Sequence, residues 1–209
     1  MRMGIPVASV LILIFILWLH YEMKKNSKIS KDTLELFWQK ERDSNQTRRK
    51  DISQLNFLSF TLESLPMEDC EDDTINSYRD TIRKYAARKM VNLSGQTNTD
   101  LKLEYGVANF NLLSEYDTNY IAFVSMLQKW AQRLYDHGHL KESQAVLEFS
   151  IFQCSTDVTQ AYQLLAGLYH KQELPLKTAT LIERIRQTQI REKERLIEEL
   201  EAYTLSNKM

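Results

Sequence analysis

The chain has 209 residues, of which 43% are hydrophobic and 26% are charged, and its formal net charge is −1. This is an ordinary globular composition, sufficient for a domain with a sizeable core. Because only 5 Gly and 3 Pro occur, the sequence predicts an all-α fold with short connections and not a sheet-rich one. The two cysteines, Cys70 and Cys154, exclude a disulfide framework and do not form a metal-ligand pair.

The first feature along the chain is an uncharged apolar segment from Gly4 to Tyr21, GIPVASVLILIFILWLHY. As a helix this segment rises about 27 Å, which is just enough for the hydrocarbon core of a bilayer. Trp18 and Tyr21 lie where interfacial aromatic residues are expected. The sequence therefore predicts one transmembrane anchor in residues 1–23. A cleaved signal peptide is the competing interpretation, but the end of the apolar run offers no small residues for cleavage.

A basic segment follows the predicted span. Residues 24–50 carry nine basic and four acidic residues, a net charge of +5, whereas residues 51–209 carry a net charge of −6. The lysines next to the span are Lys24, Lys25, Lys28 and Lys31, against Arg2 before it. The positive-inside rule therefore predicts a cytoplasmic domain. The lysines are also expected to face anionic lipid, the alternative being a solvated linker. The acidic main domain has no basic stripe for nucleic acid.

Residues 24–66 are interpreted as a juxtamembrane segment and linker. Within it, a capping-box variant at Asp32 predicts a short amphipathic helix from about Asp32 to Ser44, with Leu34, Phe37 and Trp38 on one face. That helix could lie on the membrane or pack on the domain. Residues 51–66 carry turn signals, which favour an extended segment laid over the helical core.

A helical domain is predicted for residues 67–205, where apolar residues recur at spacings of three and four. The first helix is expected to end near Met90, before a polar break. A second helix is expected from about Leu101 to Glu115. Asp117 or Thr118 would then cap a longer helix that ends near His137.

An internal repeat is visible in the second half of the domain. Leu134-Tyr135 recurs as Leu168-Tyr169, a period of 34 residues. The run WAQRLYDHGHLKESQAVLE, which starts at Trp130, resembles a tetratricopeptide unit in its small residue, its Leu-Tyr pair and its turn glycine. A second, degenerate unit lacks that glycine. The resemblance implies helix pairs near residues 124–157 and 158–191, with a capping helix from Lys193 to Tyr203.

The complete layout resembles membrane-anchored helical-repeat proteins of low-GC Gram-positive bacteria. The order is an anchor, a basic segment that ends in Arg-Arg-Lys-Asp-Ile-Ser at Arg48 to Ser53, then Asn-Thr-Asp-Leu-Lys-Leu-x-Tyr-Gly at Asn98 to Gly106, then the repeat. This resemblance implies no particular activity.

The tetratricopeptide resemblance implies a groove lined by the first helix of each pair, in which a peptide or helix of a protein partner binds. The implied groove residues are Gln128, Gln132, Tyr135 and Asp136 in the first unit and Tyr162, Tyr169 and His170 in the second. Tyrosine suits such a groove because it combines a large contact area with a hydroxyl. The alternative is that Tyr135 and Tyr169 pack between the units.

The sequence contains no recognisable catalytic motif, phosphate loop or nucleophile elbow. His137-Gly-His139 could be a metal pair, but solvated turn histidines are the preferred interpretation, and no cofactor or metal is expected. The favoured function is a membrane-anchored module that recruits a protein partner. The alternative is a structural subunit of a larger membrane complex. A polar concave surface would favour the first, and a strong exposed apolar patch the second.

Overall fold

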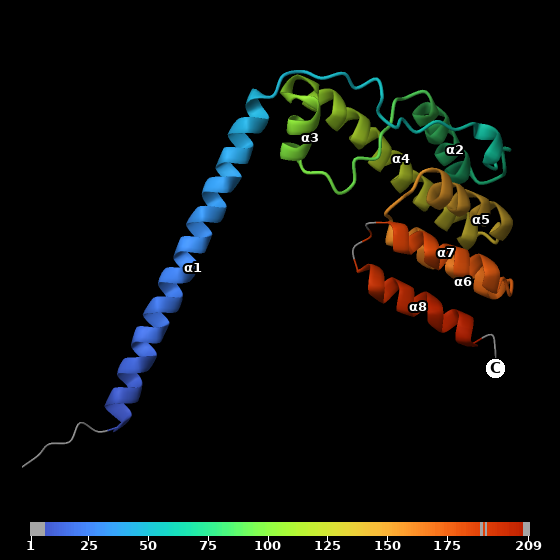
Figure 1. Cartoon of the computed structure of the whole chain (residues 1–209). Helices are drawn as coiled ribbons and strands as arrows, with labels where there is room; N and C mark the ends of the chain where they lie inside the picture. Colours follow the sequence, from blue (N-terminus) through green and yellow to red (C-terminus); the bar gives the residue numbers. More distant parts are fainter. Residues whose placement is uncertain (1–6, 189, 191, 207–209) are drawn as a thin grey trace, which may run out of the picture. The chain divides into compact units, whose positions relative to one another are not determined.

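The computed structural model describes residues 7–188, 190 and 192–206. Within these ranges the chain is all-helical, as predicted, and its one β-type contact is an isolated bridge between Phe57 and Val91. The chain divides into two compact units (Figure 1). The first consists of α1 and α3 with the residues that adjoin them, and the second contains α2 and α4 to α8.

The first helix, α1, runs without interruption from Val7 to Gln46. The predicted separate helix from Asp32 to Ser44 is therefore wrong, because it is the last part of α1. Neither Gly nor Pro occurs from residue 7 to residue 65, so the helix continues through the capping signal at Asp32.

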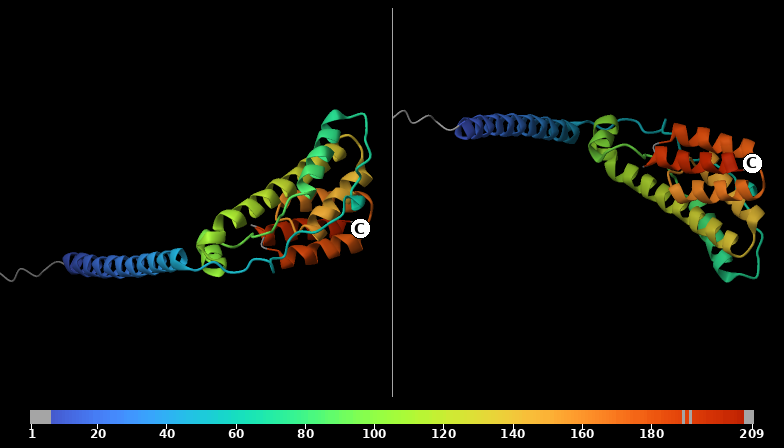
Figure 2. Two further views of the ribbon diagram at one scale, coloured as in Figure 1. Left: turned by 90° about the horizontal axis from the view of Figure 1, so that it is seen from above. Right: turned by 90° about the horizontal axis from the view of Figure 1, so that it is seen from below.

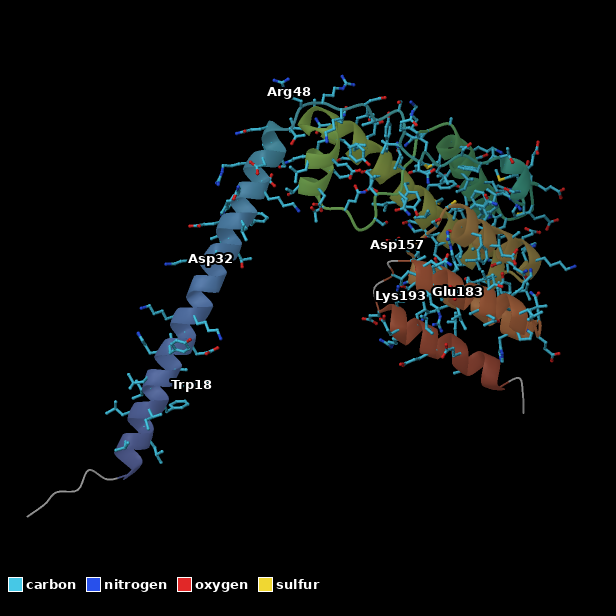
Figure 3. The ribbon with its side chains drawn as sticks, in the orientation of Figure 1. Trp18, Asp32, Arg48, Asp157, Glu183 and Lys193 are labelled. Carbon is cyan, nitrogen blue, oxygen red and sulfur yellow. The ribbon has the colours of Figure 1, made fainter. Side chains whose placement is uncertain are left out.

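The predicted transmembrane span coincides only in part with α1, because Gly4 to Pro6 lie outside the described residues. Large apolar side chains from Val10 to Leu19 are between 42% and 62% exposed, and Figure 3 shows Trp18 pointing away from the helix. In the described part of the chain, no helix combines the length and apolar character needed to cross a membrane.

The short helix α3, Asn98–Tyr105, packs against the last turns of α1. Glu41 is the centre of this contact: it accepts hydrogen bonds from Lys102 Nζ at 2.8 Å and from Thr99 Oγ1 at 2.7 Å. The backbone N–H of Lys50 donates to the carbonyl of Tyr105 at 3.1 Å. The two motifs singled out in the sequence, at Arg48 and at Asn98, thus contribute to the same contact.

Gly106 ends α3 with a φ of +84°, and the 3-10 turn η2, Val107–Asn109, leads into α4, Phe110–Asp136. The predicted break near Asp117 is wrong, because α4 is continuous there. The Asp117 carboxylate accepts a hydrogen bond from the backbone N–H of Leu93 at 3.3 Å and caps no helix. The break occurs at Gly106 because a glycine adopts the left-handed conformation that terminates a helix without strain.

The second unit is built from antiparallel helix pairs (Figure 2). Its elements are the 3-10 turn η1 (Leu62–Ser64), α2 (Asp73–Ala86), α4, α5 (Leu140–Glu148), the π-helical segment η3 (Phe149–Gln153), α6 (Thr159–Lys171), α7 (Pro175–Gln187) and α8 (Lys193–Ser206). α2 packs on α4, α4 pairs with α5, α6 pairs with α7, and α8 contacts both α6 and α7.

The two helix pairs are equivalent at a period of 35 residues and not at the predicted 34. The turn of the first pair has a bond from His139 N–H to the carbonyl of Leu134, and the second has the same bond from Leu174 to Tyr169. Positive φ values likewise occur at Gly138 (+81°) and, 35 residues later, at Glu173 (+56°). The repeated Leu-Tyr dipeptide predicted the wrong period. Equivalent positions of the two helix pairs share their burial and not their residue types.

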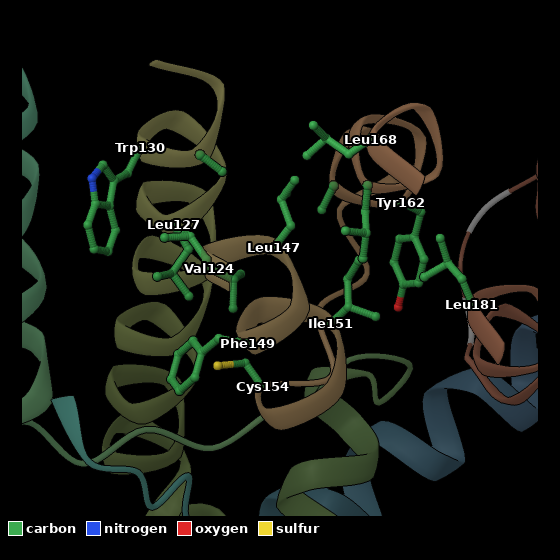
Figure 4. Close-up of a cluster of buried hydrophobic side chains, with 14 of the residues drawn as sticks. Val124, Leu127, Trp130, Leu147, Phe149, Ile151, Cys154, Tyr162, Leu168 and Leu181 are labelled. Carbon is green, nitrogen blue, oxygen red and sulfur yellow. The ribbon is translucent and has the colours of Figure 1, made fainter. Parts of the chain in front are cut away.

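One apolar core joins the helices of the second unit (Figure 4). Trp130 on α4, Ile151 in η3 and Leu165 on α6 are among its fully buried residues. The extended segment predicted for residues 51–66 lies over this core, where the Phe60 ring stacks on Phe123 with centroids 5.1 Å apart. Between α4 and α5, the buried hydroxyl of Ser143 donates a hydrogen bond to the carbonyl of Ala131 at 2.8 Å.

Candidate functional site

The groove residues predicted on α4 lie along one side of that helix. Gln132 is exposed and donates a hydrogen bond to Asp136 at 2.8 Å. Gln128 and Tyr135 are half-buried. The Lys171 ammonium of α6 lies 4.7 Å from the centre of the Tyr135 ring and also contacts its hydroxyl. The predicted groove residues on α4 therefore share a face, and the Lys171 ammonium already covers part of it.

The groove residues predicted on α6 do not share one surface. Tyr162 is 0% and Tyr169 2% exposed, and both belong to the core. The Tyr162 hydroxyl donates to the carbonyl of Thr156 at 2.8 Å, and the Tyr169 hydroxyl donates to Glu148 at the same distance. His170 is half-buried.

The 35-residue period explains this division. With that period, His170 is the counterpart of Tyr135, and the counterparts of Gln128 and Asp136 are Gln163 and Lys171, which are both exposed. The face of α6 that corresponds to the predicted groove is therefore displaced by one residue from the predicted set.

A polar cleft of about 590 Å³ lies elsewhere in the second unit, and none of the predicted groove residues lines it. It is formed by an extended segment, by the loop after Val91, by the end of η3 and by the end of α7. The lining residues are Asn56, Phe57, Leu58, Ser59, Asn92, Ser94, Tyr120, Gln153, Cys154, Ser155, Asp157, Arg184, Gln187 and Thr188. This volume is within the range of protein sites for small ligands and short peptide segments.

Ser155 is one of the residues that line the polar cleft. It ends the helical segment with a φ of +56°, a left-handed conformation that is unfavourable for a residue with a side chain. The Tyr120 hydroxyl lies 3.0 Å from the carbonyl oxygen of Cys154 and 3.1 Å from that of Ser155, and Asn92 Nδ2 donates to both Tyr120 and Ser155. Arg184 Nη2 donates to Ser155 Oγ at 2.6 Å. Side chains from three separate elements thus hold one strained turn in place.

The ionisable groups of the cleft favour binding over nucleophilic chemistry. Burial raises the pKa of the Cys154 thiol to about 12, so the thiol is protonated and unreactive near neutral pH. Burial also raises the pKa of Tyr120, so the phenol stays neutral. Among the described residues, the charges that line the cleft are one cation, Arg184, and one exposed anion, Asp157, to which Ser94 Oγ donates at 3.4 Å.

Comparison of the chain with protein-family models, curated proteins and solved structures finds no match in any of the three.

A second hollow, of about 540 Å³, contains the two turn histidines that the sequence raised as a metal pair. His137 and His139 line it together with Cys70, Glu71 and Asp72, a juxtaposition that sequence reasoning missed. Across the described residues, no cluster of such side chains has an arrangement suited to a metal ion. Moreover, the Asp72 carboxylate caps α2 and is paired with Arg133 at 2.8 Å, and that guanidinium opposes the binding of a cation.

Proposed function

We propose that this chain is a membrane-anchored protein-interaction module, which recruits a protein partner through the polar cleft of its helical-repeat unit. The observation that carries the proposal is the cleft itself. It is polar and of suitable volume, its turn at Ser155 is held in place, and its thiol is inert. Such a site suits recognition, because its ordered framework reduces the entropy lost on binding. The tetratricopeptide resemblance supports the same class of function.

The anchor in this proposal is the apolar segment from Gly4 to Tyr21, which combines residues outside the described part with the start of α1. Its support is the exposed apolar run from Val10 to Leu19, which occupies every side of the helix and so needs cover on all sides. A bilayer provides such cover, and a groove on one protein partner does not. Lys24, Lys25 and Lys31 are exposed beyond this run, and the side chain of Lys28 lies outside the described part. They support a cytoplasmic domain.

The alternative, a structural subunit of a larger membrane complex, requires a large apolar surface on the repeat unit. Among the side chains that the structure describes on that unit, the large exposed apolar ones are Ile121, Leu140, Phe152 and Leu176, which belong to four different elements. Single exposed apolar residues are normal on a monomeric protein. The distribution favours the interaction module.

The test is site-specific photocrosslinking in cells with the full chain. A photoreactive residue is placed at Gln187 in the cleft or, as a control on the same helix, at Glu183, which is exposed and does not line the cleft. The interaction module predicts a discrete adduct with a second protein from Gln187 and none from Glu183. Equal adducts from both positions would instead indicate a surface covered by a permanent assembly.

A further inference from the structure

The walls of the polar cleft are rich in side-chain amides. Asn56, Asn92, Gln153 and Gln187 line it. A side-chain amide offers one acceptor and two donors, with nearly the spacing of a peptide group, so it can pair with the backbone of an extended chain. Asn92 is already engaged with Tyr120 and Ser155, whereas the other three are exposed and available to a bound segment.

Arg184 is the positive charge that the described part of the chain contributes to this lining. Its guanidinium is half-buried and is held on one side by the 2.6 Å bond from Nη2 to Ser155 Oγ. Its Nε is buried with no acceptor in the described part of the chain. A ligand in the cleft therefore reaches the Nη groups and not the buried Nε. These groups suit a carboxylate, since the planar guanidinium offers parallel N–H groups that match the two carboxylate oxygens. Because the Ser155 turn is itself held by Tyr120 and Asn92, the guanidinium is positioned before any ligand arrives.

Asp157 sets a limit on the ligand. This carboxylate lines the same cleft and is exposed. A run of acidic residues would bring further negative charge next to it, and like charges at short range repel. The lining therefore suits a segment with one carboxylate, placed at Arg184, and uncharged neighbours.

We propose that the polar cleft binds an extended peptide segment whose single carboxylate pairs with Arg184 while its backbone pairs with the amides of Asn56, Gln153 and Gln187. This inference rests on the proposed function and names the chemistry of the partner. The carboxylate comes either from an Asp or Glu side chain or from a chain terminus, and both sources present the same group to the guanidinium.

The test uses the full chain in lipid nanodiscs and dodecapeptides selected on it from a random library. Each selected peptide is labelled with fluorescein, and its affinity is measured by polarisation. A version with its acidic residue changed to the amide and a version with an amidated terminus distinguish the two sources of the carboxylate. The protein variants are Arg184→Gln, Arg184→Lys and, as a control on the same helix, Lys177→Gln, whose ammonium pairs with Glu148 away from the cleft.

We expect selected peptides to contain one acidic group and to bind Arg184→Gln at least about 10-fold more weakly, with a smaller loss for Arg184→Lys and none for Lys177→Gln. One of the two neutralised peptides should lose affinity to the same extent. If Arg184→Gln does not fold, as judged by its melting transition, the neutralised peptides on the unmodified protein decide the question.

A Ser94→Trp variant, which fills the cleft, separates failure of this inference from failure of the proposed function. Peptides that are blocked by Ser94→Trp but bind Arg184→Gln normally would overturn the carboxylate assignment and leave the interaction module standing. Selection of no peptide, or only of peptides that Ser94→Trp leaves unaffected, would overturn both.

Discussion

Gly106 is the position at which we expect the smallest change to have the largest local effect. Its φ of +84° would cost an alanine about 1–2 kcal/mol. A Cβ at this position would also lie 2.2 Å from the carbonyl oxygen of Arg48 and 2.8 Å from the Cα of Arg49. These are backbone atoms that cannot rotate away, and such overpacking costs a further ~1–3 kcal/mol. We therefore expect Gly106→Ala to weaken the α1–α3 contact by about 2–5 kcal/mol.

Two other glycines provide matched controls. Gly138 has nearly the same φ, +81°, but a Cβ there would have open space around it, so Gly138→Ala should cost only the conformational ~1–2 kcal/mol. Gly167, inside α6, also has open space and needs no left-handed conformation. Gly167→Ala should therefore stabilise the second unit by about 0.5–1 kcal/mol through helix propensity.

Hydrogen exchange measured by mass spectrometry on the full chain separates these effects by location. In Gly106→Ala, amide exchange in α3 should become at least about 10-fold faster while exchange in α6 stays unchanged, since each 1.4 kcal/mol corresponds to a factor of ten. Gly138→Ala should leave α3 unaffected. Unchanged α3 exchange in Gly106→Ala would refute the steric argument, and equal acceleration by both variants would refute the difference between the two sites.

The remaining predictions concern the anchor, the helix packing and the capping of α2. Leu13→Lys should release the protein from membranes on alkaline carbonate extraction, because a charge at the centre of a span costs about 2.5–3.5 kcal/mol. The control Leu36→Lys, at an exposed apolar site on the same helix, should not release it. Release by neither variant would contradict the anchor. Ser143→Leu should lower the melting temperature, because it overpacks a site that is 0% exposed, which costs about 1–3 kcal/mol. Half-buried Ala145 should tolerate a change to leucine better. The reverse order would contradict the 35-residue register. Hydrogen bonds from backbone N–H groups in the first turn of α2 and the Arg133 guanidinium lower the pKa of Asp72. The ionised carboxylate therefore contributes its full stabilisation of the fold above the ordinary pKa of aspartate. That contribution is lost as the pH falls through the lower folded-state pKa. Melting temperature below about pH 4 should therefore fall less steeply in Asp72→Asn, which keeps the cap but does not titrate, and identical profiles would refute this assignment.

The helical class could be predicted from the sequence because it depends on local properties, namely the scarcity of breakers and the spacing of apolar residues. Boundaries were less predictable where two local signals competed. Gly106 is a plausible C-terminus of one helix, and Asp117 is a plausible N-cap of the next. The glycine ends α3 because the backbone of Arg48 and Arg49, which follows α1, leaves no room for a Cβ, and that contact is between residues far apart in the sequence.

The repeat register and the cleft were beyond sequence reasoning for different physical reasons. When the two repeats are aligned at a period of 34 residues, Tyr162 and Tyr169 fall at groove positions, but the buried face of α6 includes both of them. Ser155, Arg184 and Asn92 share no period and no motif, and they meet only because a π-helical segment ends in a left-handed turn. No single residue type encodes a π-helical segment, so the sequence offered no signal for this turn.

The first compact unit is discontinuous in sequence, which has a consequence for the order of events during synthesis. Glu41 and Ser44 leave the ribosome early, but Thr99 and Lys102, which complete the contact with Glu41, follow more than fifty residues later. At about 5–20 residues per second, the end of α1 waits several seconds for α3. The first unit can therefore close only after residues 51–97, the first part of the second unit, have been synthesised.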